Sequence, residues 1–217
     1  MNFEQERFNM VEQQIRPWEV LDSRVLALLE DIHREDFVPV RYRKLAFADL
    51  AIPLDCGQVM MRPKIEARML QALDLAEGET VLEIGTGSGF ITACLAALAK
   101  RVVSVEIFRE LHEDAALKLK DKKIRNAEVF IGDVMKGWQP EQAHDVVVIT
   151  ASVPEVPEQF LGWVNPGGRL FVVTGESPAM EARVLKRLDA TEWSEESLFE
   201  TDLPRLINAE RAPEFEF

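Results

Sequence analysis

The stretch that decides the fold is Val81-Leu82-Glu83-Ile84-Gly85-Thr86-Gly87-Ser88-Gly89. Its first four residues predict a buried strand with one acidic side chain near its end. Three glycines at alternate positions follow, and residues 90–98 are mostly small and apolar, as expected of a buried helix. Such a strand, glycine turn and helix form a mononucleotide-binding unit, because glycine lets the backbone bend and lets a ligand approach the main chain.

From this unit onward, strands and helices alternate along the chain. Strands are predicted at residues 80–84, 102–106, 127–131, 146–149, 169–174 and 197–202. Helices are predicted at 90–98, 111–122, 157–164 and 180–188. Strands joined through helices of about 10–15 residues predict right-handed crossovers and a Rossmann-like, doubly wound, mostly parallel sheet. The fold class is therefore α/β.

The part of the chain before this sheet has a different pattern. Helices are predicted over residues 3–15, from 22 onward and over 63–75, with irregular chain between the last two. We expect residues 1–78 to be a helical extension with an active-site loop, packed on a core of residues 79–217, so that the whole is one compact domain.

Composition excludes several classes of protein. A formal charge of -13 argues against general affinity for nucleic acid or anionic membranes. No apolar run approaches the ~20 residues of a membrane span, and the acidic N-terminus is unlike a signal peptide. With only Cys56 and Cys94 as cysteines, a reduced, cytoplasmic protein is the simplest interpretation. His33, His112 and His144 are scattered, so neither a catalytic triad nor a metal site is predicted.

The glycine spacing selects the cofactor. A dinucleotide fold needs a third glycine at position 90, which is Phe90 here. Glu106 follows the second strand, where a carboxylate can bind a ribose diol, and Asp133 follows the third, placed to accept from an adenine amino group. An acidic strand end at Glu83 beside open backbone N–H groups suits the ammonium, carboxylate and sulfonium of S-adenosylmethionine. We therefore predict this cofactor, with S-adenosylhomocysteine as product.

A resemblance extends beyond the glycine strand. The residues that carry it are 10–15 (Met-Val-Glu-Gln-Gln-Ile), 34–39 (Arg-Glu-Asp-Phe-Val-Pro), 46–49, 52–54, 57–58, 81–89, 132–133, 137–138, 145–151, 153–154, 156–157 and 167–170. In these segments the chain resembles the protein-L-isoaspartate O-methyltransferase family. The resemblance implies a class I methyltransferase fold with an N-terminal helical addition. It also implies methyl transfer to the free carboxylate of an isoaspartyl residue in a damaged protein, whose ester then cyclises to a succinimide.

Site residues follow from the motif and the resemblance together. The predicted cofactor-binding residues are Gln58, Val59, Glu83, Gly85, Thr86, Gly87, Gly89, Glu106, Asp133 and Val134. The predicted substrate-binding residues are Met60, Met61, Arg62, Lys64, Thr150 and Ala151.

The loop before residue 62 departs from the family. Where the family has Gly-Gln-Thr-Ile-Ser, this chain has Gly57-Gln58-Val59-Met60-Met61, so Met61 stands at the serine taken to touch the reacting groups. Two hydrogen-bonding side chains thus become apolar in a site meant for a carboxylate, a costly loss where a charge is left unpaired. Arg62 or Lys64 could supply positive charge instead, or could be solvent-facing residues of a helix start.

Three functions remain open at this point. The first is isoaspartyl carboxyl methylation, which needs alignment and exclusion of water but no general base, because a carboxylate of pKa ~4 is already ionised. The second is methylation of another, small apolar acceptor, which Met60 and Met61 suit better. The third is a module that binds the cofactor without catalysis.

Overall fold

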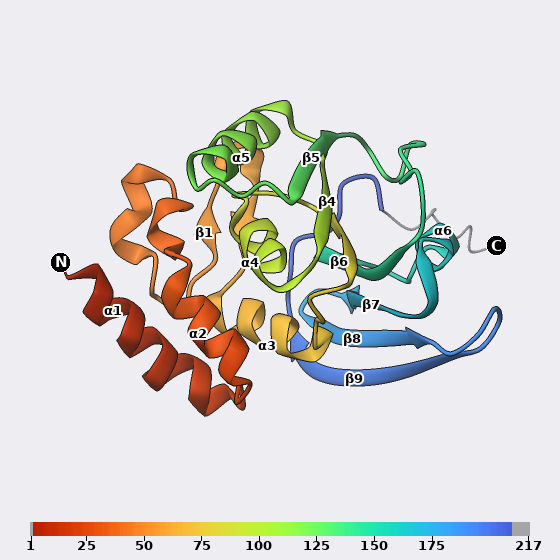
Figure 1. The fold of residues 1–217 in the computed structure, drawn as a ribbon, viewed down its shortest axis with the longest axis horizontal. Helices are drawn as coiled ribbons and strands as arrows, with labels where there is room; N and C mark the ends of the chain where they lie inside the picture. The colour runs from red at the N-terminus through yellow and green to blue at the C-terminus, as the bar shows by residue number, and fades with distance from the viewer. Residues whose placement is uncertain (1, 210–217) are drawn as a thin grey trace, which may run out of the picture.

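The computed structural model describes residues 2–209 and places them around a seven-stranded sheet (Figure 1). Its strands are β3 (Thr80–Ile84), β4 (Arg101–Glu106), β5 (Ala127–Ile131), β6 (His144–Val153), β7 (Val164–Glu176), β8 (Ala179–Arg187) and β9 (Trp193–Thr201). The spatial order is β5-β4-β3-β6-β7-β8-β9, with β3 to β7 parallel and β8 and β9 antiparallel to their neighbours. The predicted doubly wound, mostly parallel sheet is confirmed. Residues 210–217 of the predicted core lie outside the described part.

Helices cover the two faces of the sheet unequally. They are α1 (Phe3–Met10), α2 (Ser23–Asp31), α3 (Pro63–Leu73), α4 (Phe90–Leu98), α5 (Arg109–Asp121) and α6 (Glu158–Gly162). A π-helical turn, Val11–Ile15, continues α1. Side chains from α1 to α5 share one apolar core with one face of the sheet, whereas Phe160 of α6, Leu206 and Ala209 pack on the other. In Figure 1, α1 and α2 lie at the left end and the β8–β9 hairpin reaches to the right.

A small two-stranded sheet precedes α3. It pairs β1 (Ile52–Pro53) antiparallel with β2 (Val59–Met60), and the turn between them contains a short 3-10 helix, Asp55–Gly57. The loop predicted to face the active site is therefore held at both ends by strand pairing.

The helix predicted at residues 180–188 is wrong, because this segment is strand β8. Its apolar residues Met180, Ala182 and Val184 alternate with more exposed residues, and all three pack into the core from one face of the strand. The chain enters β8 from β7 through Ser177 and Pro178 alone, a connection that suits an antiparallel hairpin and is too short for a crossover helix.

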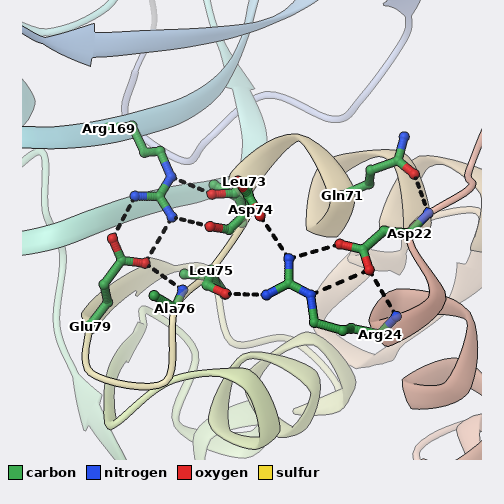
Figure 2. Close-up of polar contacts among 9 residues, drawn as sticks. All are labelled: Asp22, Arg24, Gln71, Leu73, Asp74, Leu75, Ala76, Glu79 and Arg169. Atoms are coloured by element: carbon green, nitrogen blue, oxygen red, sulfur yellow. Dashed lines mark hydrogen bonds and ion pairs between the residues drawn. The ribbon is translucent and has the colours of Figure 1, made fainter.

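Arg169 on β7 fixes the turn between α3 and β3 (Figure 2). Its guanidinium donates to the carbonyl oxygens of Leu73 and, at 2.9 Å, Asp74, which the end of the helix leaves unpaired. It also forms two hydrogen bonds with Glu79, 2.7 and 2.8 Å long. Hydrogen bonding to Arg169 lowers the pKa of the Glu79 carboxyl, which stays ionised at neutral pH.

Arg24 on α2 binds the same turn from the other side. It donates to the Leu75 carbonyl at 2.9 Å and pairs with Asp74 at 2.7 Å. Gln71 on α3 accepts hydrogen bonds from the N–H groups of Leu21 and Asp22, at 2.6 and 2.9 Å. The N-terminal helices are thus attached to the sheet through the ends of α3 as well as through apolar packing.

The glycine turn after β3 is closely packed against β6. Gly85 has a φ of +96°, and a Cβ there would lie 2.5 Å from Thr150 Oγ1. The Thr150 hydroxyl is itself fixed, because it donates to the carbonyl oxygens of Ile84 at 3.0 Å and Gly85 at 2.6 Å. Position 85 therefore requires glycine both for its backbone conformation and for space.

We expect Gly85→Ala to lower the free energy of unfolding by at least about 2 kcal/mol, through left-handed strain and the clash with Thr150. Gly78→Ala is the matched control, because a Cβ at Gly78 meets nothing within 4 Å. Its effect should stay within about 1 kcal/mol. Urea unfolding of both variants measures the difference, and equal effects would contradict this account of the turn.

Candidate active site

A cleft opens at the carboxyl ends of β3, β4 and β6. This is the edge where parallel α/β sheets bind ligands. The residues that line it are Gln58, Val59, Met61, Ile84, Gly85, Gly87, Val105, Glu106, Ile107, Phe108, Leu111, Gly132, Asp133, Val134, Thr150, Ala151, Pro204, Arg205, Leu206 and Ile207.

Most of the predicted site residues meet in this cleft. Of the predicted cofactor residues, those that line it are Gln58, Val59, Gly85, Gly87, Glu106, Asp133 and Val134. Of the predicted substrate residues, those that line it are Met61, Thr150 and Ala151. Segments far apart in sequence therefore converge where the glycine turn predicted a ligand.

Glu106 is held rigidly at the end of β4. Its Oε2 accepts from the Gly87 N–H at 2.8 Å, and its Oε1 accepts from the Phe108 N–H at 3.0 Å. The carboxylate is 5% exposed, so it joins the glycine turn to the next connection while remaining part of the cleft wall. Two main-chain donors fix the acid and leave its other lone pairs for a ligand diol.

Asp133 after β5 also lines the cleft. Its Oδ1 accepts from the Met135 N–H at 2.9 Å, which orders the loop, and its Oδ2 accepts from the Asn208 amide at 2.7 Å. Asn208 thus stands at the oxygen predicted to receive an adenine amino group. A ligand there must share or replace this hydrogen bond.

Glu83 lies outside the cleft, unlike the predicted contact with the cofactor. It is fully buried, and its Oε2 accepts from Thr92 Oγ1 at 2.5 Å and Ser104 Oγ at 2.6 Å, while Oε1 has no partner within residues 2–209. Burial raises the pKa of Glu83 to about 8, against the opposing effect of these hydroxyls. Glu83 is therefore mainly neutral at pH 7 and cannot offer a full negative charge to an ammonium group.

Five other predicted residues do not line the cleft either. Thr86 is buried with its hydroxyl 2.6 Å from that of Ser104, and Gly89 packs against α5. Met60 is buried, and Arg62 is exposed just before α3. Lys64 pairs with Asp49 at 2.8 Å and lies over the Trp18 ring. Neither of the two cations proposed from sequence reaches the cleft.

Two groups of lining residues were not predicted from sequence. Ile107, Phe108 and Leu111 form an apolar wall where β4 leads into α5, and a strand followed by apolar residues was a signal that could have found them. Residues 204–207 come from beyond β9 and carry no pattern that marks them as part of a site.

Arg34 holds the loop at Met61 from below. It is fully buried and binds both carboxylate oxygens of Glu66, at 2.9 and 3.1 Å. It also donates to the carbonyl oxygens of Ala46 at 2.8 Å and Met61 at 2.7 Å, with its guanidinium 5.4 Å from the centre of the Phe90 ring. The main chain of the loop is therefore fixed whatever side chains it carries.

These features fit S-adenosylmethionine. The Glu106 carboxylate suits a ribose diol, Asp133 suits an adenine amino group, and Ile107 and Val134 offer apolar surface for the base. The main chain at Gly85 and Gly87 is bare of side chains where the methionine end would pass.

Comparison with known proteins supports the same cofactor. Residues 5–201 match the family model described as protein-L-isoaspartate(D-aspartate) O-methyltransferase. The chain belongs to this family. It is similar to the protein-L-isoaspartate O-methyltransferase of Parvibaculum lavamentivorans, 36% identical over 87% of this chain and 84% of that one. It is also similar to that of Methanoculleus marisnigri, 38% identical over 84% of this chain and 83% of that one.

A solved structure confirms the fold. A putative family member from Plasmodium falciparum, crystallised with S-adenosyl-L-homocysteine, has a TM-score of 0.78 and 17% identity, covering 95% of this chain and 98% of that one. Family membership confirms the predicted class I fold, the S-adenosylmethionine cofactor and the assignment as a methyltransferase.

Two further features of the described chain bear on function. Within residues 2–209, no helix has both the length and the apolar character to cross a membrane. In the same part of the chain, no group of three or more His, Cys, Asp or Glu residues is placed to hold a metal ion.

Glu106→Gln should weaken binding of S-adenosylhomocysteine by about 10- to 100-fold. The amide nitrogen of the variant cannot accept from the Gly87 or Phe108 N–H, and hydrogen bonds to a charged group contribute ~1.5–3 kcal/mol. Calorimetric titration measures the affinity. Glu113→Gln, on the exposed surface of α5, is the control and should bind normally. An unchanged affinity in Glu106→Gln would show that this carboxylate does not contribute to binding S-adenosylhomocysteine.

The raised pKa of Glu83 predicts a pH dependence of stability. Between the ordinary pKa of 4.5 and about 8 only the folded state keeps the proton, so the free energy of unfolding should fall as pH rises through this window. One proton gives a slope of about 1.4 kcal/mol per pH unit.

Glu83→Gln, which mimics the neutral acid, should remove that slope. Urea unfolding from about pH 5 to about pH 9 compares the two proteins. The same slope in both would assign the pH dependence to other groups.

Proposed function

We propose that this protein methylates the free carboxylate of L-isoaspartyl residues in damaged proteins. The observation that carries the proposal is the convergence of the family's segments on one cleft. Its lining includes Gln58, Val59 and Met61 of the loop, the predicted cofactor residues, and Thr150 and Ala151. A cytoplasmic location, also proposed, is supported by Cys56 and Cys94, which are both free thiols.

When bound, the cofactor would supply a sulfonium methyl group for in-line transfer to the acceptor oxygen, with the electron pair of the broken carbon–sulfur bond left on sulfur. The protein's part is to align the two groups and exclude water. Met61 is 6% exposed and Val59 is partly buried, so this side of the cleft is apolar and dry.

No base is required of the protein in this reaction, because the acceptor is already an anion at neutral pH. The cleft is consistent with this, since its lining within residues 2–209 contains no histidine. The Thr150 hydroxyl cannot act as a base, since its proton is directed to the carbonyl oxygens of Ile84 and Gly85. Thr150 and Ala151 instead contribute small side chains to the wall of the cleft.

The test compares two synthetic peptides that differ only in one isoaspartyl or aspartyl linkage. With labelled S-adenosylmethionine, we expect base-labile methyl ester on the isoaspartyl peptide and at least about tenfold less on its aspartyl twin. Heat-aged protein, which accumulates such residues, serves as a second acceptor. Cofactor binding without label on either acceptor would overturn the proposal.

A small apolar acceptor is the second candidate, favoured by the Val59 and Met61 side chains in the cleft. Met61→Ser separates the two. If the parent already methylates isoaspartyl peptide, the serine should change its rate only modestly. If activity on isoaspartyl peptide appears only in the variant, the natural acceptor is the apolar one.

A further inference from the structure

The segment that follows β9 completes the cleft. It runs beside the end of β6: the Ser152 N–H donates to the Pro204 carbonyl at 2.9 Å, and the Leu206 N–H donates to the Ser152 carbonyl at 2.8 Å. The Ser152 hydroxyl adds a hydrogen bond to the Leu203 carbonyl at 2.9 Å. The segment lies just beyond the residues that match the family model, which end at 201.

Arg205 in this segment is the one cation that lines the cleft within residues 2–209. Its Nη2 donates to the Gly175 carbonyl at 2.9 Å and to Glu176 Oε2 at 2.8 Å. Its Nη1 is shielded from solvent yet has no acceptor in the described chain. The guanidinium is therefore held in place with one donor unused.

A carboxylate is the natural partner for this unused donor. A shielded donor without a partner is unfavourable, and a guanidinium matches the planar geometry of a carboxylate. Glu176 neutralises Arg205 only weakly, because its side chain is 64% exposed and surrounded by water. The ion pair with Glu176 therefore leaves most of the positive charge of Arg205 uncompensated.

Arg205 also supplies the charged hydrogen-bond donor that the loop lacks. Val59 and Met61 offer no hydrogen bonds, and Arg62 and Lys64 do not reach the cleft. Without Arg205, an anionic acceptor entering beside Ala151 would meet the carboxylates of Glu106 and Asp133 with no cationic side chain of the protein to offset them.

We propose that Arg205 binds the carboxylate of the methyl acceptor and so selects anionic acceptors in this chain. This inference rests on the proposed function for the identity of the acceptor. The carboxylate of the cofactor is the other possible source of the same chemistry, and the experiment separates the two.

Arg205→Met should raise the KM for isoaspartyl peptide at least about tenfold, because one charge-assisted hydrogen bond is lost, and should change kcat less. Arg205→Lys, which keeps the charge, should give an intermediate KM. The affinity for S-adenosylhomocysteine, measured by calorimetry, should remain within about twofold. Arg183→Met is the matched control: Arg183 pairs with Glu181 and Glu195 outside this cleft, and its loss should leave the KM unchanged.

An unchanged KM in Arg205→Met would overturn the inference. A parallel loss of S-adenosylhomocysteine affinity would also overturn it, by assigning Arg205 to the cofactor. If Arg205→Met does not fold, Glu176→Gln decides instead: removal of the competing carboxylate should lower the KM about two- to fivefold, and an unchanged KM counts against the inference.

A binding measurement keeps this test separate from that of the proposed function. In the complex with S-adenosylhomocysteine, the wild type should bind isoaspartyl peptide at least about tenfold more tightly than the same peptide with its free carboxylate converted to a carboxamide. Arg205→Met should lose this preference. If the wild type shows none, the inference fails. If it shows the preference but transfers no methyl group, the proposed function fails and Arg205 remains a carboxylate-binding residue.

Discussion

The buried pair of Arg34 and Glu66 is the interaction on which the site depends. One guanidinium joins a short helix of the N-terminal extension, helix α3 and the carbonyl of Met61. A buried charge pair is tolerated only when its remaining hydrogen bonds are satisfied, and here the carbonyls of Ala46 and Met61 satisfy them. Loss of Glu66 would leave the Arg34 charge buried and unpaired, whereas loss of Arg34 would raise the pKa of the buried Glu66 carboxyl further and favour its neutral form.

This arrangement explains how the loop can differ from its family without losing its place. Arg34 holds the main chain of Met61, and β1 pairs with β2 on the other side of the turn, so neither contact depends on the side chains at Val59 or Met61. The loop side chains are therefore free to set the chemistry of the acceptor. A departure from the family at Met61 is compatible with an intact fold for the same reason.

Sequence predicted the parts of the site that belong to a recognisable motif or follow a strand. Glu106 and Asp133 were found because each follows a strand in a repeating pattern, and the structure brings both to the cleft. Glu83 belongs to the same pattern, but its side chain points under α4 to Thr92 and Ser104, and a strand pattern does not say which face a terminal residue takes. Strand β8 was predicted as a helix because its residues suit both structures and only the pairing with β7 and β9 decides.

Arg205 could not be predicted because its partners at Ser152 and Gly175 are set by tertiary packing alone.

The position of Arg205 also has a consequence for the order in which the site is synthesised. Synthesis proceeds from the N-terminus, so every strand of the sheet has left the ribosome before residues 204–207 do. A nascent chain can thus assemble the sheet and its glycine turn while one wall of the cleft is still missing. The wall that recognises the acceptor is then added only after the last strand of the sheet has been synthesised.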